Sequence, residues 1–264
     1  MILRLSQGKL LSVAVMAGSF SLSLAAQTKP LFTETFESGK IDPAVWDTRT
    51  ASTVTIAVEP VDGAHGKFAL HVHYPTDAAR NSYAFIVNTH LPTAVKTHFF
   101  GRAYVFAKSD LGMGHNPLIF AGEPGYPLSK FTEIGMYKGT WQPSYQENKS
   151  VAGQGRGEVT YHAEAGPPVG KWFLLEWEFN DNPASITYWV DGEKILTPVG
   201  PEKEKKESVT FEWPKNSGTT SGLIGPSGYQ ELGVGARVWG ASANGFDLYY
   251  DDIAIGTTRL GPVK

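Results

Sequence analysis

Alternating side-chain character along the chain predicts many short β-strands, because successive side chains on a strand point to opposite faces. The stretch from His98 to Phe106 separates most clearly: one set of alternate positions is apolar and suited to packing on another sheet. The other set is aromatic and cationic, and comprises His98, Phe100, Arg102, Tyr104 and Phe106. Such a face suits a groove where sugar rings stack and a carboxylate is held, although an ordinary solvated strand face is the alternative.

Two later strands show the same two-faced character. The stretch from Phe131 to Lys138 places Glu133 and Tyr137 on one face and runs on into Trp141 and Gln142. The stretch from Glu231 to Trp239 has an apolar core face and a second face with Glu231, Arg237 and Trp239. We therefore expect the three two-faced strands to contribute to one groove.

The remaining pattern predicts an all-β fold. Strand-like runs are separated by turn signals about every ten residues, as at Asp191-Gly192, and no long amphipathic helix interrupts them. His71 and His73 fall on the polar face of one such run and are interpreted as surface or groove-edge residues. The charged run 202–207 is interpreted as a solvated loop or helical turn. Together these patterns predict a two-sheet antiparallel β-sandwich, a jelly roll with an open groove.

The N-terminus resembles a secretory signal. Arg4 and Lys9 precede an apolar run that ends in small residues, and the run is too short and interrupted for a comfortable membrane span. Residues 1–26 are therefore predicted to be a signal peptide and residues 27–264 a single domain, with a secreted or periplasmic location. A buried N-terminal helix is the alternative.

Composition limits the possible partners and chemistry. The net charge is −3 with no long basic block, so neither nucleic acid nor an anionic membrane is expected as a partner. Cysteine is absent, which excludes disulfides, thiol catalysis and cysteine-ligated metals. A polysaccharide is the expected ligand, and a monomer is the expected state.

Several segments carry a family resemblance: Phe32 to Trp46, GRAYVF, FTEIGMYKGTWQ, YWVDGEKI and YYDDIAIG. Together they resemble the concanavalin-like jelly-roll proteins, and within these the polysaccharide-lyase-like group of the fungal cellulose-induced protein and its bacterial relatives. The resemblance covers most of residues 31–260. It implies an extracellular jelly roll, a structural calcium ion, and a groove comparable to those of alginate and glucuronan lyases.

The implied calcium needs hard oxygen ligands. In this fold family the chain termini pair, which would bring Glu37 close to Asp251 and Asp252. These three residues are the expected ligands. The alternative is that Asp251 and Asp252 form a polar strand end with ordinary hydrogen bonds.

The implied lyase chemistry, β-elimination from a uronate, needs a cation for the carboxylate, a base and an acid. Arg102 and Arg237 are the candidate cations, and Tyr104, Tyr137 and His115 are the candidate base and acid. Candidate substrate-binding residues are Phe100, Glu133, Trp141, Gln142, Glu231 and Trp239. In a purely structural interpretation, the arginines pair with Glu133 and Glu231.

Two other functions remain open. A glycoside hydrolase would use two carboxylates across the groove, for which Glu133 and Glu231 are the candidates. A non-catalytic carbohydrate-binding protein would use the aromatic residues alone for stacking. The leading hypothesis is a secreted lyase or lyase-like protein that acts on a uronate-containing cell-wall polysaccharide.

Overall fold

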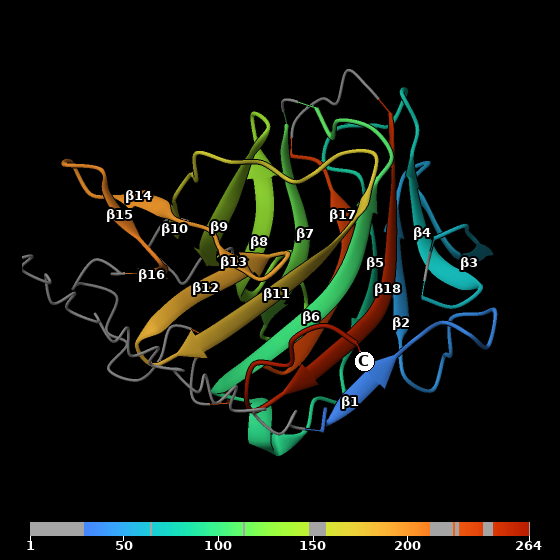
Figure 1. Cartoon of the computed structure of the whole chain (residues 1–264), viewed down its shortest axis with the longest axis horizontal. Helices are drawn as coiled ribbons and strands as arrows, with labels where there is room; N and C mark the ends of the chain where they lie inside the picture. The colour runs from blue at the N-terminus through green and yellow to red at the C-terminus, as the bar shows by residue number, and fades with distance from the viewer. Residues whose placement is uncertain are drawn as a thin grey trace, which may run out of the picture.

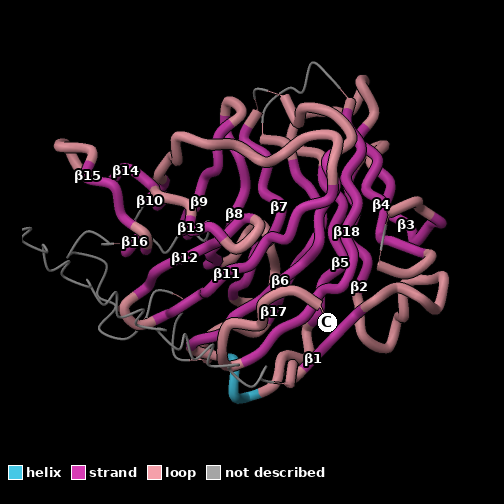
Figure 2. The backbone as a smooth tube through the Cα atoms, in the orientation of Figure 1, coloured by secondary structure: helices cyan, strands magenta, loops and turns pink. Residues whose placement is uncertain are grey.

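The computed structural model of the chain describes residues 29–63, 65–112, 114–147, 157–211, 224, 227–239 and 245–263. The predicted signal peptide, residues 1–26, lies outside this range. Within it the chain forms two large antiparallel sheets stacked face to face, one in front of the other in Figure 1. The tube view in Figure 2 is almost entirely strand and loop. No helix in the described ranges is long and apolar enough to cross a membrane.

The seven-stranded sheet has the order β10-β9-β8-β7-β17-β5-β2. Its strands are β10 (Gly157–Thr160), β9 (Thr140–Glu147), β8 (Lys130–Tyr137), β7 (His115–Gly122), β17 (Glu231–Arg237), β5 (Tyr83–Asn88) and β2 (Asp47–Ala51).

The nine-stranded sheet has the order β13-β12-β11-β6-β18-β4-β3, with β1 beside β18 and β16 beside β12. Its strands are β13 (Glu193–Lys194), β12 (Ala184–Val190), β11 (Trp172–Asp181), β6 (His98–Ala107), β18 (Phe246–Gly256), β4 (Phe68–Tyr74), β3 (Thr55–Pro60), β1 (Phe32–Glu34) and β16 (Ser208–Thr210). The small pair β14 (Thr197–Val199) and β15 (Glu204–Lys206) and the 3-10 turn η1 (Thr93–Val95) complete the described elements.

The core fills the space between the two sheets. Alternate residues of β17, namely Leu232, Val234 and Ala236, face it from one side, and Ala103 and Val105 of β6 face it from the other. The sandwich and the two-faced character of the strands are therefore confirmed. Pairing of β1 with β18 is confirmed as well, with Phe32 opposite Ile255.

The expected continuation of the strand beyond Lys138 is wrong. Lys138 and Gly139 both have positive φ, 51° and 78°, so they form a tight two-residue turn of the hairpin type. The chain reverses there, and β9 returns along β8 with Trp141 opposite Met136. A similar turn is confirmed at Asp191-Gly192, where φ is 51° and 86°.

The expected loop or helical turn over residues 202–207 is wrong in part. Glu204–Lys206 forms the strand β15, which pairs with β14. All three of its side chains are exposed. Charged side chains of this kind are common on edge strands, where they discourage further strand pairing, so the charge pattern marks an exposed edge.

Candidate functional site

Polar side chains gather on the outer face of the seven-stranded sheet. Strand alternation turns Ile134, Met136 and Trp141 toward the core, so the neighbouring positions of β8 and β9 face away from it. The cross-strand register places Glu133 opposite Ser144, and Gly135 opposite Gln142. This face therefore carries a band of acid, amide and hydroxyl groups, which β7 and β17 extend with His115 and Arg237.

Glu133 lies at the centre of this band. Its side chain is fully buried, and its Oε1 accepts hydrogen bonds from Ser144 Oγ and Gln146 Nε2, each 2.8 Å long. His115 Nε2 lies 3.1 Å from the same oxygen. Glu133 thus lies beside Nε2 of the imidazole ring without hydrogen-bond geometry, and Nδ1 is the nitrogen left for a ligand.

Arg237 is the cation of this face, and aromatic rings surround it. Its guanidinium carbon lies 3.4 Å from the centre of the Trp239 ring, a close cation–π contact. The rings of Tyr83 and Tyr126 are each 5.8 Å away. Only 5% of Arg237 is exposed, so the half-buried Trp239 ring shields the charge from solvent.

The loop after β7 covers part of the face. Tyr126 stacks on Phe120 with ring centres 3.8 Å apart, and it meets the edge of Phe131. Burial, reinforced by the negative charge of Glu133, raises the pKa of Tyr126 well above its ordinary value. The phenol therefore stays protonated and available as a hydrogen-bond donor.

Several buried polar atoms on this face have no hydrogen-bond partner. They are His115 Nε2, Glu133 Oε2, Gln142 Oε1, Trp239 Nε1, and Nε and Nη1 of Arg237. Buried polar groups in native proteins are nearly always satisfied, and each exception costs about 1–3 kcal/mol. So many unpartnered donors and acceptors on one face indicate that a polar ligand or water completes them.

Glu231 serves a structural role on this face. Arg49 donates hydrogen bonds to both carboxylate oxygens of Glu231, from Nη1 to Oε2 at 2.9 Å and from Nη2 to Oε1 at 2.7 Å. Only 2% of Glu231 is exposed. In the purely structural interpretation Arg102 and Arg237 would pair with Glu133 and Glu231, but β2 supplies Arg49 to Glu231 instead. Arg49 engages both oxygens of Glu231, and neither Glu133 nor Glu231 is accessible to solvent. The two glutamates are therefore not suited to be the carboxylate pair of a glycoside hydrolase.

Arg102, Tyr104 and Phe100 lie on the other sheet. All three belong to β6 of the nine-stranded sheet, so the expectation that they share a groove with Glu133 and Arg237 is wrong. Arg102 Nη1 donates to Gly261 O at 2.9 Å, and Tyr104 OH accepts from Val263 N at 3.3 Å. Arg102 and Tyr104 therefore anchor the C-terminal segment, and a hollow of about 400 Å³ lies between that segment and β11.

Trp141 lies in the core, which overturns its expected role as a stacking residue. It is fully buried and packs edge-on against Phe173 and Tyr188. The turn at Lys138-Gly139 causes this, because reversal of the chain places Trp141 beside Met136. Gln142 and Tyr137 do lie on the outer face, with Tyr137 opposite His115.

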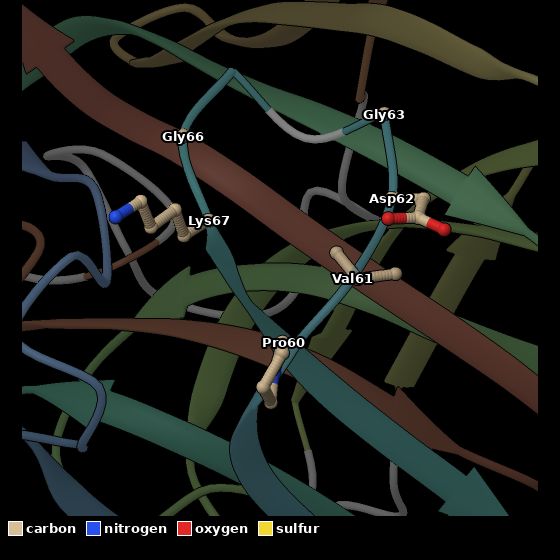
Figure 3. A pocket seen from close by; sticks show the side chains of 6 residues that line it. All are labelled: Pro60, Val61, Asp62, Gly63, Gly66 and Lys67. Atoms are coloured by element: carbon tan, nitrogen blue, oxygen red, sulfur yellow. The ribbon is translucent and has the colours of Figure 1, made fainter.

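Figure 3 shows the loop between β3 and β4, with Pro60 at one end and Lys67 at the other. The three expected calcium ligands contact this loop and the start of β4. Glu37 Oε1 accepts from the backbone N–H groups of Lys67 and Phe68, at 2.8 and 3.0 Å. Asp251 accepts from His65 N, and Asp252 contacts the His65 ring at 2.5 Å. Each carboxylate is thus directed at the loop.

These carboxylates do not converge on one point. Among the described residues, Glu37, Asp251 and Asp252 do not form a group with ligand atoms within 4.8 Å of one another. Burial and the neighbouring charge of Asp252 raise the pKa of Asp251 to about 6. In this geometry the three carboxylates cannot all bind one calcium ion. The adjacent carboxylates of Asp251 and Asp252 are the ones that would attract a cation.

No family model matches the sequence, and no curated protein matches it either. Among solved structures, a cellulose-induced protein is 19% identical to this chain, with a TM-score of 0.62. The match covers 88% of this chain and 100% of the cellulose-induced protein. An endo-β-1,4-glucuronan lyase from the fungus Trichoderma reesei is 16% identical, with a TM-score of 0.59, and the match covers 87% of this chain and 96% of the lyase. The chain has a concanavalin-like jelly-roll fold.

This jelly-roll fold brings together site residues that the sequence interpretation missed. Ser144 and Gln146 contact Glu133 from β9, Tyr126 covers the face, and Arg49 neutralises Glu231. Alternation along β9 could have found Ser144 and Gln146 once the turn at Gly139 was recognised. Sequence spacing held no comparable signal for Tyr126, which lies in the irregular loop between β7 and β8, or for Arg49, which reaches Glu231 from β2, distant in the chain.

Proposed function

We propose that the outer face of the seven-stranded sheet binds a uronate-containing polysaccharide and cleaves it by β-elimination. The observation that carries this proposal is the group of buried, unpartnered polar atoms on Gln142, Arg237 and Trp239, beside the partly accessible His115. A glycan supplies hydroxyl and carboxylate groups that would satisfy both donors and acceptors. The same fold in a glucuronan lyase supports the substrate class.

Arg237 is the group that neutralises the uronate carboxylate. Its Nε and Nη1 are unpartnered donors on different edges of the guanidinium, and a carboxylate oxygen and a neighbouring sugar hydroxyl would accept from them. The Trp239 ring lies on the guanidinium and is half-buried, so a carboxylate reaches Arg237 when this ring moves aside. Trp239 then provides a surface for a sugar ring.

His115 and Tyr137 are the proton-transfer pair. They lie opposite each other on β7 and β8, and both are partly accessible. His115 removes the proton from C5 of the uronate, the C4–O bond breaks as the C4=C5 double bond forms, and Tyr137 protonates the leaving oxygen. Glu133, close to His115 Nε2, orients the imidazole and stabilises its cationic form after proton transfer.

A screen of purified protein on glucuronan, alginate, pectate, xanthan and neutral glucans tests the reaction. Elimination creates a double bond that absorbs in the ultraviolet, whereas hydrolysis creates only reducing ends. The variants His115→Gln and Tyr137→Phe should each lower turnover by about 10²–10⁴-fold while binding is retained. His98→Gln is the matched control, because His98 is an exposed histidine on the other sheet that also contacts a glutamate, Glu178. Reducing ends without absorbance would contradict the elimination mechanism.

A carbohydrate-binding protein without turnover is the second candidate. The observation that favours it is burial: Glu133 is fully buried and Arg237 is only 5% exposed. A site used only for binding needs no access to these groups, since Trp239 and Tyr137 at the accessible edge would contact the sugar. In that case Trp239→Ala abolishes retention on the polymer, His115→Gln leaves it unchanged, and no substrate yields absorbance.

Export and a structural calcium ion complete the proposal. The N-terminal pattern supports secretion or a periplasmic location, where the polysaccharide would be met. Asp251 and Asp252 would bind calcium together with oxygens of the β3–β4 loop, and the ion would tie this loop to β18. Chelation should then lower the thermal midpoint, and added calcium should restore it. An unchanged midpoint would exclude the ion.

A further inference from the structure

A group of two histidines and one aspartate lies on the outer face of the nine-stranded sheet, on the opposite sheet from the proposed polysaccharide site. His71 and His73 are two residues apart on β4, so strand alternation turns both rings to the same side. The paired strand β18 places Asp247 opposite His73 and Tyr249 opposite His71. Three potential metal ligands thus come from adjacent positions of two paired strands.

The ligand atoms are already close together. Asp247 Oδ1 lies 2.8 Å from His71 Nε2 and 2.8 Å from His73 Nδ1, and all three ligand atoms are within 4.8 Å of one another. Ligands at about 2.0–2.1 Å from a tetrahedral ion are separated by about 3.3–3.4 Å. Each of the two Asp247–histidine separations needs to lengthen by only about half an ångström to admit an ion at those bond lengths.

The two nitrogens of His71 both face carboxylates. Nδ1 lies 2.8 Å from Glu59 Oε2, and Nε2 lies 2.8 Å from Asp247 Oδ1. A neutral imidazole has one N–H, so one of these contacts lacks a proton. If Nδ1 donates to Glu59, a lone pair on Nε2 faces the carboxylate of Asp247, and a positive charge belongs between them. A second ring proton or a bound metal ion would supply this charge, and the spacing of the cluster suits the metal ion.

Glu59 and Tyr249 hold His71 as metal-binding histidines are usually held. The ring nitrogen that does not bind the metal commonly donates to a carboxylate, which sets the tautomer and the ring orientation. Tyr249 stacks on His71 with ring centres 4.3 Å apart and an angle of 8°. The ring is thereby fixed with Nε2 directed at Asp247.

We propose that His71, His73 and Asp247 bind a divalent transition-metal ion of the zinc class, with Glu59 as the positioning residue. Two imidazoles favour zinc, cobalt, nickel or copper over calcium or magnesium, which prefer oxygen ligands. The side chain of His73 is 48% exposed and that of Asp247 is 24% exposed, so the ion is reachable from solvent and keeps a position for water. Thr55 and Ala57 on β3, opposite His73 and His71, are small and leave room for this coordination.

Titration with Zn²⁺ tests the proposal. The untagged protein is first treated with chelator and then titrated in the presence of excess calcium, at a pH where imidazole is neutral. The wild type should bind one equivalent. His73→Ala and Asp247→Asn should each weaken binding by at least about tenfold, and Glu59→Gln by about 10–100-fold. His73 is half exposed, so its loss should leave the fold intact, which circular dichroism verifies. Co²⁺ should give visible absorption bands that His73→Ala abolishes.

His98→Ala is the matched control. His98 lies on the same sheet, its side chain is 44% exposed, and it contacts a single carboxylate, Glu178, at 2.7 Å. Its removal should leave Zn²⁺ affinity unchanged. The proposal is overturned if the wild type binds no Zn²⁺, which would identify a protonated histidine–carboxylate cluster, or if the His73→Ala, Asp247→Asn and His98→Ala proteins all bind like the wild type.

Discussion

Replacement of Trp141 by alanine should destabilise the fold rather than weaken carbohydrate binding. The side chain is fully buried between the sheets and packs against Phe173 and Tyr188, with ring centres 6.1 and 6.0 Å away. Truncation of a buried aromatic residue to alanine costs about 3–5 kcal/mol through lost apolar burial and the cavity left behind.

The indole nitrogen of Trp141 lowers the expected cost of this truncation. Trp141 Nε1 is buried without a hydrogen-bond partner, and its removal relieves a penalty of about 1–3 kcal/mol. We therefore expect Trp141→Ala to cost nearer 3 than 5 kcal/mol. For a chain of this length, a loss of 3 kcal/mol corresponds to a fall of about 6–12 °C in the thermal midpoint. Trp141→Phe keeps most of the ring and loses the unpartnered N–H, so its midpoint should change little.

Thermal and urea unfolding followed by far-ultraviolet circular dichroism measure this effect without relying on tryptophan fluorescence. Trp239→Ala is the control, because Trp239 is half-buried on the outer face and lies on Arg237. It should cost less than Trp141→Ala, about 1–2 kcal/mol, because it removes a cation–π contact but no core packing. A Trp141→Ala protein as stable as the wild type would refute the core placement and, with it, the β8–β9 register.

Two further perturbations test the electrostatics. Arg49→Ala leaves the buried carboxylate of Glu231, which is 2% exposed, without its cation, and should cost about 3–5 kcal/mol in urea unfolding. Lys205→Ala is the control, because it breaks an exposed pair with Glu164 and should cost under about 1 kcal/mol. Equal effects of the two substitutions would contradict the buried ion pair. In chelated protein, the pKa of Asp251 is about 6 in the folded state against an ordinary value of 3.8, so the folded state binds this proton more tightly than the unfolded state. The contribution of Asp251 to the free energy of unfolding is therefore fully present below pH 3.8. It falls by at most about 3 kcal/mol as the pH rises through 6. Asp251→Asn should flatten that part of the stability profile, and an unchanged profile would assign it to another group.

Local sequence was sufficient for the strands and for much of their alternation. The runs at β6, β8 and β17 were predicted within a few residues of their observed bounds, apart from the continuation beyond Lys138. The reason is physical: a side-chain period of two is a property of the strand itself, and burial of one face imposes apolar residues on alternate positions. The turn at Asp191-Gly192 was predictable for a similar local reason, since these residue types tolerate positive φ.

The turn at Lys138-Gly139 shows where local inference stopped. Lysine is not a preferred residue for positive φ, so the sequence was interpreted as one continuous strand. On a continuous strand Trp141 shares the face of Glu133, whereas after the turn it lies opposite Met136 in the core. A single unrecognised reversal therefore moved a residue from a predicted binding site to the interior.

By itself the sequence determined the fold class and the two-faced character of the strands, and only the tertiary structure decided which sheet each strand joined. β6 resembles β8 and β17 in its aromatic and charged face, yet it pairs with β11 and β18 in the other sheet. Alternation is identical in both sheets, because it reports a strand's own geometry and not its hydrogen-bonded neighbours. Pairing between distant strands separated Arg102 from Arg237 and brought His71, His73 and Asp247 together.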